Sequence, residues 1–386
     1  MLSSIATLPW GGLSGCYDQT PEIAEAILAL ARADPAQRSK GLSTLWSCIW
    51  HQGTRYEVSP YVVPFLYELL AAPATRGKHE IINLLAYLAL GFPDEYVPSG
   101  FDILAARQTW VDFERIAIEE NYEPALRFAL RGSEQAHYDA VGGGIHTLIN
   151  LLDDGEPAVR QAAAFAVAWF PEHAAEALPR LRERAQGEDE PAPLASLIVA
   201  IGLLERSPYG GGALDEFESF LSHSEPIVRG TAALALCHNP LSPAARRVLH
   251  ELLLSHDHFI FPKAVMPFCD GNLVRYATDA LTICGPRIRD ETLAMLCAAL
   301  PQAEPAQALD CTNAILHFAA RQRSLLWSPS APADLEDWQR AALRAVSDHG
   351  CWLAKDAPFG VRERWLGMPD TQEHLRRYLD GDDTIV

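Results

Sequence analysis

The chain has 386 residues, of which 49% are hydrophobic and 21% are charged, a composition that is ordinary for a folded protein and excludes a chain that is disordered throughout. Its 50 acidic residues outnumber its 31 basic residues and give a net charge of −19, which opposes binding to the phosphate backbone of nucleic acid. The acidity fits a basic protein partner, whose complementary charge would speed the encounter, and it also fits solubility without any partner.

The first third of the chain, 1–135, is predicted to form divergent helical repeats. Apolar residues recur there at helical spacing, as in the run at 60–70, where they would form one buried stripe. Proline and glycine at 92–101 predict a loop. The helices predicted in this third lie at 21–31, 41–51, 60–70, 78–90, 110–118 and 124–131.

An aromatic and polar string at 46–57 is the most conspicuous local feature. Trp46 and Trp50 would lie on one face of a helix, and Gly53 is expected to end that helix. The string resembles a segment near the start of bacterial HEAT-repeat proteins of undefined role, a resemblance that implies no activity. Two interpretations stay open: an aromatic joint between helices, with His51 capping carbonyl groups, or a polar cluster at a concave rim. The first is favoured, and the candidate binding residues are Trp50, His51, Gln52, Arg55 and Tyr56.

A phrase that recurs about every 35 residues follows in the middle of the chain. It begins at Pro157 and returns at Pro226, 69 positions later, with Pro191 between them. A period in this range is typical of stacked helical hairpins. Proline is tolerated in the first turn of a helix, where an amide hydrogen would lack a partner, and the alanines at 162–164 would allow close packing between helices.

The recurring phrase resembles HEAT repeats, including the subgroup called PBS-lyase HEAT-like repeats. One copy carries the resemblance in Asp153, Pro157, Val159, Arg160 and Ala163, and the next in Pro226, Val228, Arg229 and Ala232, while 271–277 is similar but has lost its proline. The resemblance implies an all-α, right-handed α-solenoid of HEAT-like hairpins over 136–325, with a concave surface built from the second helix of each repeat. It also implies that the Asp and Arg positions stack neighbouring repeats; these are Asp153, Arg160, Arg229 and Arg275.

The spacing between repeats lengthens once, because Arg229 and Arg275 are 46 positions apart. The surplus is placed at 256–271, and insertions of this kind often emerge on the binding face of a solenoid. The alternative is a hydrophobic elbow that packs back onto the stack, and the two interpretations stay open. The candidate surface residues in this insertion are His256, His258 and Phe259. These histidines, with His250 and Cys269 or Asp270, match no standard zinc spacing, so neither a metal site nor a cofactor is expected.

The last part of the chain, 326–386, is predicted to be a helical cap with an acidic tail, because terminal repeats need one polar face. The chain lacks the GxSxG, HExxH and phosphate-loop motifs. We therefore predict a non-enzymatic protein-binding scaffold; one version is an immunity-type protein that neutralises a basic toxin domain. The alternative is an enzyme with a HEAT-like fold, such as a DNA glycosylase or a bilin lyase, but fold analogy alone does not establish function.

Several features favour a cytoplasmic, bacterial protein. The first basic residue is Arg32, so no charged region of a secretory signal is expected. No stretch has the uncharged apolar length of a membrane span. The eight cysteines form no CxxC pair, which predicts free thiols in a reducing compartment. Arginine outnumbers lysine by 27 to 4, which is typical of a GC-rich bacterial coding bias. The oligomeric state is not predicted.

Overall fold

A computed structural model describes residues 2–16, 20–97, 99–120, 133–237, 241–255, 258–320, 335–350 and 371–381. These residues are mostly helical, and strands among them are limited to one short hairpin, which confirms the all-α class. The predicted helix at 124–131, the candidate residue His256 and most of the predicted acidic tail lie outside the described residues. Within the described part, no helix combines the length and the apolar character needed to cross a bilayer.

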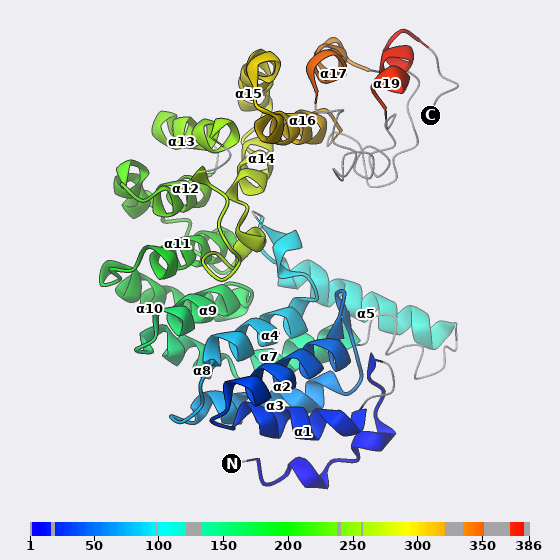
Figure 1. Ribbon diagram of the computed structural model, residues 1–386, viewed down its shortest axis with the longest axis vertical. Helices are drawn as coiled ribbons and strands as arrows, with labels where there is room; N and C mark the ends of the chain where they lie inside the picture. The colour runs from blue at the N-terminus through cyan, green and yellow to red at the C-terminus, as the bar shows by residue number, and fades with distance from the viewer. Residues whose placement is uncertain are drawn as a thin grey trace. The chain divides into compact units, whose positions relative to one another are not determined.

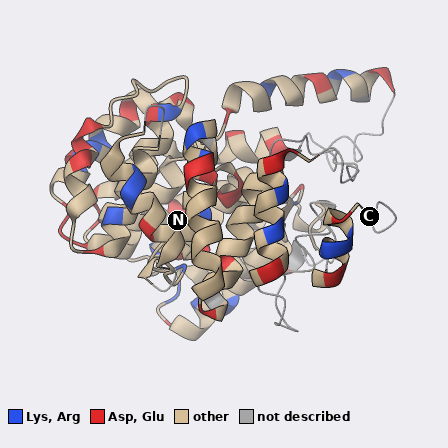
Figure 2. Cartoon of the chain, turned by 90° about the horizontal axis from the view of Figure 1, so that it is seen from above, with Lys and Arg blue, Asp and Glu red and all other residues tan. Residues whose placement is uncertain are grey.

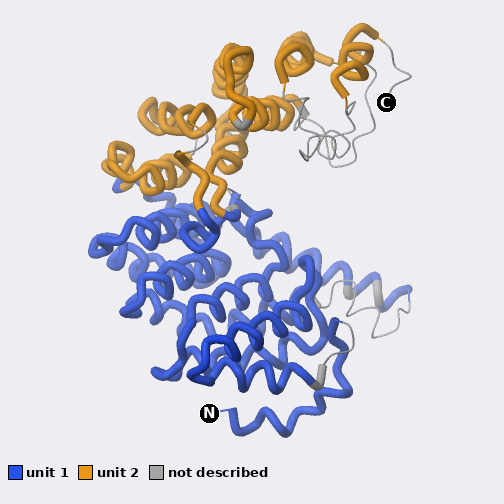
Figure 3. The backbone as a smooth tube through the Cα atoms, in the orientation of Figure 1, with its two compact units in different colours: residues 1–216, 262–270 blue, residues 217–261, 271–386 orange. Residues whose placement is uncertain are grey.

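The chain forms two compact units. The first comprises 1–216 together with 262–270, and the second comprises 217–261 and 271–386 (Figure 3). The segment 262–270 therefore packs with the first unit, although the residues before it (217–261) and after it (271–386) belong to the second.

The helices of the first unit are labelled in Figure 1. They are α1 Thr20–Leu30, α2 Pro35–Cys48, α3 Ser59–Ala71, α4 Lys78–Leu90, α5 Ile103–Glu119, α7 Ser133–Gly142, α8 Ile145–Asn150, α9 Pro157–Val167, α10 Ala174–Gln186 and α11 Pro191–Arg206. The strands β1 Trp50–His51 and β2 Thr54–Arg55 form the hairpin. The second unit contains α12 Pro226–Ala235, α13 Pro243–Leu254, α14 Leu273–Ile283, α15 Pro286–Ala299, α16 Pro305–Ala320, α17 Asp337–His349 and α19 Gln372–Leu379.

In the first unit, consecutive helices pack against each other in pairs, and one helix of each pair contacts a helix of the next pair. Helix α4 contacts both α2 and α9, and α9 in turn contacts α11. Helix α3 contacts α4, α8 contacts α9, and α10 contacts α11. We call α2, α4, α9 and α11 the front row. Helix α5, which contacts α7, is not part of the front row and extends away from it in Figure 1. The candidate site described below lies on the front row.

Small side chains explain how closely the front row packs. Ala162, Ala163 and Ala164 in α9 are 3% exposed or less, and so are Ala86 and Ala89 in α4. Alanine lets two helix axes approach without a cost in side-chain entropy. Proline at the first position of α9 and α11 fixes the start of each helix where its missing N–H costs nothing.

An arginine fixes the start of a helix in each unit. The guanidinium of Arg160 donates to the backbone carbonyls of Asp154 at 3.0 Å and Gly155 at 3.3 Å, just before α9. It also forms a bidentate pair with Glu188, which precedes α11, at 2.7 and 2.8 Å. Glu188 is buried. Because charge-assisted bidentate pairs are strong and geometrically selective, this pair joins α9 to the next helix pair.

Arg229 repeats this arrangement in the second unit. It donates to the carbonyls of His223 at 2.8 Å and Ser224 at 3.4 Å, just before α12, and to the Glu251 carboxylate of α13 at 2.8 Å. The same residue type at the same place in the repeated phrase therefore makes the same contacts with the carbonyls five and six positions before it, and each arginine also pairs with a carboxylate further along the chain. The pair with Glu251 is more exposed than the Arg160–Glu188 pair.

Candidate functional site

The string at 46–57 ends a helix and forms a tight hairpin. Helix α2 ends at Cys48, and Trp50 pairs with Arg55 across the two-residue turn of Gln52 and Gly53. Both turn residues have positive φ, 49° and 83°, as two-residue hairpin turns require. The expectation that the helix continues to His51 and ends at Gly53 is wrong, because these two left-handed residues reverse the chain instead.

The hairpin places Trp50 in a cluster of four aromatic rings. Trp50 contacts Trp46 of α2 and Tyr87 of α4 edge to face, with ring centres 5.1 and 5.4 Å apart, and Trp46 contacts Tyr87 at 5.4 Å. Phe92 lies on the other side of Trp50 at 5.7 Å. Edge-to-face pairs of this geometry are stabilising. Trp46 and Trp50 are therefore neighbours as predicted, but across a helix end rather than on one helix face.

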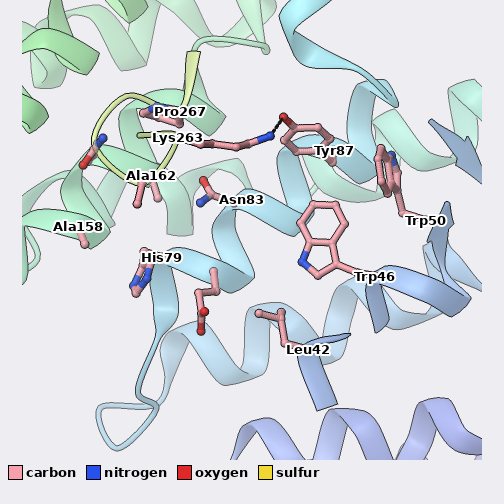
Figure 4. A pocket seen from close by; sticks show the side chains of 13 residues that line it. Leu42, Trp46, Trp50, His79, Asn83, Tyr87, Ala158, Ala162, Lys263 and Pro267 are labelled. Carbon is pink, nitrogen blue, oxygen red and sulfur yellow. Dashed lines mark hydrogen bonds between the residues drawn. The ribbon is translucent and has the colours of Figure 1, made fainter. Parts of the chain in front are cut away.

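These rings form one wall of a cavity of about 530 Å³ on the front row of the first unit. Figure 4 shows Trp46, Trp50 and Tyr87 on one side and Lys263 opposite them. The size is in the range of pockets that hold a small ligand or one large side chain. The lining consists of Leu42 and Trp46 from α2; Trp50; His79, Glu80, Asn83 and Tyr87 from α4; Ala158, Gln161 and Ala162 from α9; and Lys263, Ala264 and Pro267 from segment 262–270.

Two polar groups in this lining have no hydrogen-bond partner. The Nδ1 atom of His79 and the Oδ1 atom of Asn83 are both buried, and neither has a partner among the described residues. His79, Asn83 and Tyr87 are spaced four residues apart on α4, so they lie along one face of the helix. A buried polar group without a partner costs about 1–3 kcal/mol. Such groups in a cavity are therefore suited to a ligand that supplies the missing hydrogen bond.

A chain of polar contacts joins segment 262–270 to α4. The ammonium group of Lys263 donates to the Tyr87 hydroxyl and, at 2.6 Å, to the Asp270 carboxylate. The Tyr87 hydroxyl in turn donates to Asp94 at 3.1 Å. Lys263 lies 4.5 Å from the centre of the Tyr87 ring. The cation of Lys263 is thus held at the edge of the cavity between the Asp270 carboxylate and the Tyr87 phenol.

Aromatic packing holds the same segment in place at its other end. Phe268 is fully buried, with its ring centre 4.9 Å from that of Phe165 and 5.7 Å from that of Trp169. The side-chain amide of Gln161 donates to the backbone carbonyl of Val265 at 2.7 Å. The inserted segment therefore packs as an elbow through Phe268, and Lys263 of the same segment lines the cavity. The interpretation of the insertion as a binding loop stays a prediction.

A second cavity of about 490 Å³ lies near the hairpin, lined in part by Gly53 and Phe92. Arg55 lines it, with its Nη1 donating to the Ala89 carbonyl at 2.7 Å and its Nη2 3.8 Å from Glu134. Burial lowers the pKa of Arg55, and Glu134 opposes this effect. The Trp50 indole donates to the Gly91 carbonyl at 2.9 Å. Arg55 and Trp50 are thus tied to the backbone that follows α4.

The other predicted residues of the hairpin are arranged around it. His51 is half-buried and Gln52 is exposed at the turn. Tyr56 is half-buried, its N–H donates to the Ser59 hydroxyl at 3.1 Å, and its carbonyl contacts Nε2 of His137 at 2.9 Å. The structure brings together the five predicted residues of the hairpin, but only Trp50 lines the cavity on the front row.

The two described candidate residues of the insertion, His258 and Phe259, belong to the second unit and differ in exposure. His258 is exposed, whereas Phe259 is fully buried beneath Arg229, 5.8 Å from the centre of its ring. Of the predicted stacking residues, Asp153 pairs with Arg180 of the first unit, and Arg160 and Arg229 make the contacts given above. Arg275 is exposed and lines a small polar cavity with Asp279 and His317.

The residues that sequence reasoning did not select are His79, Asn83, Tyr87 and Lys263. The first three carry a signal in the sequence, namely residues with polar groups at four-residue spacing on a helix whose other residues after Glu80 are apolar. Lys263 carries no such signal in the sequence, because Lys263 reaches α4 only through the return of segment 262–270 to the first unit.

Charged residues are spread over many helices rather than gathered on one of them (Figure 2). Near the cavity, acidic groups predominate: Glu80 lines it, Asp94 accepts from Tyr87 and Asp270 accepts from Lys263. Among the described lining residues, Lys263 is the one lysine or arginine. The neighbouring Lys78 is paired with Asp154 at 3.5 Å.

Comparison with known proteins does not identify this chain. No family model matches the sequence, and no curated protein matches it. Among solved structures, a similar one is an engineered protein from the Northeast Structural Genomics Consortium, with 17% identity, 85% of this chain and 88% of that chain covered, and a TM-score of 0.31. A likeness at that level carries no argument about fold or function.

Proposed function

We propose that this chain is a non-enzymatic scaffold that binds a protein partner, and that its helix pairs form a right-handed, HEAT-like solenoid whose concave face includes the front row. The helix pairs of the first unit and the matching contacts of Arg160 and Arg229 support the repeat assignment. The recurrence of the phrase about every 35 residues supports it independently.

The observation that carries the binding proposal is the cavity itself. Trp46, Trp50 and Tyr87 line it together with the unpartnered polar atoms of His79 and Asn83. Trp and Tyr are the residue types that most often contribute binding energy at the centre of protein interfaces. A cavity that combines such rings with unfilled hydrogen-bonding groups is suited to receive a side chain from a partner.

The charge of the chain indicates which partner to expect. A net charge of −19 favours encounter with a basic protein. An immunity-type protein that neutralises a basic toxin in the bacterial cytoplasm is the specific version that we propose. Such a complex would form rapidly at low salt and more slowly as salt screens the charges.

A cavity-filling variant tests the proposal. Ala158 lines the cavity but is exposed, so Ala158→Trp would fill the space without disturbing the core. Ala175 of α10 is also exposed and lies outside the lining, so Ala175→Trp is the matched control. Each tagged protein is used to capture partners from its host extract, with elution by a salt gradient. A candidate partner is then purified and titrated against all three proteins.

We expect one basic protein to bind the native chain and the Ala175→Trp variant alike, and to bind Ala158→Trp at least about tenfold more weakly, because a central interface contact of this kind is worth over about 1.4 kcal/mol. A partner that binds all three proteins equally would place the interface elsewhere. A partner whose affinity is independent of ionic strength would contradict the role of charge.

A further inference from the structure

We propose that the cavity recognises an arginine side chain of the partner, and that Lys263 of the chain itself holds the edge of that site in the free protein; this inference rests on the proposed function. It concerns the chemistry of the ligand rather than the existence of a partner. Three features of the cavity point to a cationic donor.

The first feature is that two residues lining the cavity, Asn83 and Tyr87, carry hydrogen-bond acceptors. The Oδ1 atom of Asn83 is a buried acceptor without a partner. The Tyr87 hydroxyl uses its proton on Asp94, so toward the cavity it accepts, as its contact with Lys263 shows. A guanidinium group offers five N–H donors in a rigid plane and no acceptor, so it complements such a lining better than a neutral amide or a carboxylate.

The second feature is the aromatic wall. The rings of Trp46, Trp50 and Tyr87 meet at interplanar angles of 72° to 89°, so the cluster presents ring surfaces in more than one direction. The face of an aromatic ring is electrostatically negative and attracts a cation, with Trp the most effective. Arginine stacks on aromatic faces, whereas the ammonium group of lysine is a compact and strongly hydrated charge. This difference favours arginine over lysine.

The third feature is the local charge. Glu80, Asp94 and Asp270 lie at or next to the cavity, and Lys263 offsets only part of their charge. Lys78 does not add to the balance, because it is paired with Asp154. An incoming cation therefore finds a site that is acidic overall.

Lys263 already supplies a cation to the acceptors at the edge of the cavity. Its ammonium group contacts the Tyr87 hydroxyl and Asp270, yet about half of its side chain is exposed. The segment that carries it is held by other residues, because Phe268 is buried between two rings and Gln161 holds the Val265 carbonyl. The Lys263 side chain can therefore swing into solvent while segment 262–270 stays in place, which would release Tyr87 to a partner's arginine.

A pair of isosteric probes tests the ligand class directly. N-acetyl-arginine methylamide carries a guanidinium, whereas N-acetyl-citrulline methylamide replaces it with a neutral urea of almost the same shape. Each is titrated into the full-length protein while tryptophan fluorescence is followed, because Trp46 and Trp50 line the cavity. We expect the arginine probe to bind in the millimolar range, as single side chains do, and about tenfold more tightly than the citrulline probe.

Two variants assign the binding to the proposed atoms. Asn83→Leu removes the unpartnered acceptor and should weaken the arginine probe about fivefold or more, while leaving the melting temperature equal or higher. Asn150→Leu, at an exposed position of α8, is the matched control. Lys263→Ala should strengthen the arginine probe severalfold, because it removes a competing cation and frees Asp270.

Each outcome decides a separate part of the inference. Equal affinity for the two probes, or an unchanged affinity in Asn83→Leu, would overturn the arginine site. Unchanged or weaker binding in Lys263→Ala would overturn the role of Lys263. If a purified partner still depends on Ala158 while the two probes bind alike, the arginine inference fails and the proposed function stands. If partner binding ignores Ala158→Trp, the proposed function fails first.

Discussion

The buried pair of Arg160 and Glu188 allows a worked prediction of stability. Arg160→Met keeps much of the apolar stem and removes both hydrogen bonds to Glu188, whose side chain is 1% exposed. Leaving a buried charge without its partner typically costs about 3–5 kcal/mol. Glu188 would keep its contacts with Arg184 at 3.3 Å and with the Glu190 N–H at 3.2 Å. We therefore expect the lower end, a loss of about 3 kcal/mol in the free energy of unfolding.

The second unit supplies the matched control for this prediction. Arg229 occupies the same place in the repeated phrase, but its partner Glu251 is 36% exposed. Water can solvate that carboxylate when the arginine is removed, so Arg229→Met should cost about 1 kcal/mol. Urea unfolding, followed by circular dichroism, measures both variants. The double variant with Glu188→Met should recover part of the loss, because no buried charge remains. The reasoning is refuted if Arg160→Met costs no more than Arg229→Met.

The same pair makes stability depend on pH. Burial alone would raise the pKa of Glu188, but hydrogen bonds from Arg160 and from the Glu190 N–H outweigh burial and lower the pKa below its ordinary value of 4.5. A carboxyl with a lowered folded-state pKa stabilises the protein fully above its ordinary value, and this contribution is lost as the pH falls through the lowered pKa. Glu188→Gln should therefore flatten the fall in stability below pH 4.5. An unchanged acid slope in this variant would contradict the assignment.

Two further substitutions test the hairpin and segment 262–270. Gly53→Ala should lower the free energy of unfolding by about 2–4 kcal/mol, because φ is 83° and the new Cβ would lie 2.1 Å from the Phe92 ring. Gly11→Ala is the control and should be neutral, because its new Cβ meets open space. Equal melting temperatures for the two variants in thermal unfolding would refute the hairpin geometry. Phe268→Ala should cost about 3–5 kcal/mol and expose 262–270 to limited proteolysis, whereas an unchanged digestion pattern would show that other contacts suffice.

The helices were predictable where their local signals are strong. The start of α9 follows from Pro157, and the start of α4 follows from the apolar run at 78–90, which the structure reproduces at the same bounds. The contacts of Arg160 and Arg229 with the preceding carbonyls fit their shared position in the repeat. These features depend on residues close in sequence, so the sequence contains the information needed to predict them.

The cavity was less predictable, because it depends on contacts between distant residues. Trp50 was identified as a candidate, but its place in a hairpin depends on Gln52 adopting positive φ, which is uncommon for a residue other than glycine. Lys263 reaches Tyr87 across 176 positions of sequence. Periodicity describes local structure only, so it cannot indicate that 262–270 returns to the first unit. Phe259 was expected at the surface but is buried, because periodicity does not indicate which residues the folded chain covers.

The most direct test of the central claim is amide hydrogen exchange of the chain with and without its purified partner. The account predicts slower exchange in α4 and in segment 262–270, where the cavity lies, and weaker protection in the Ala158→Trp variant at the same partner concentration. Helix α19 of the second unit, which contributes nothing to the cavity lining, should exchange equally in both states. Protection confined to the second unit or to α5, with α4 unchanged, would contradict the claim that the aromatic cavity is the binding site.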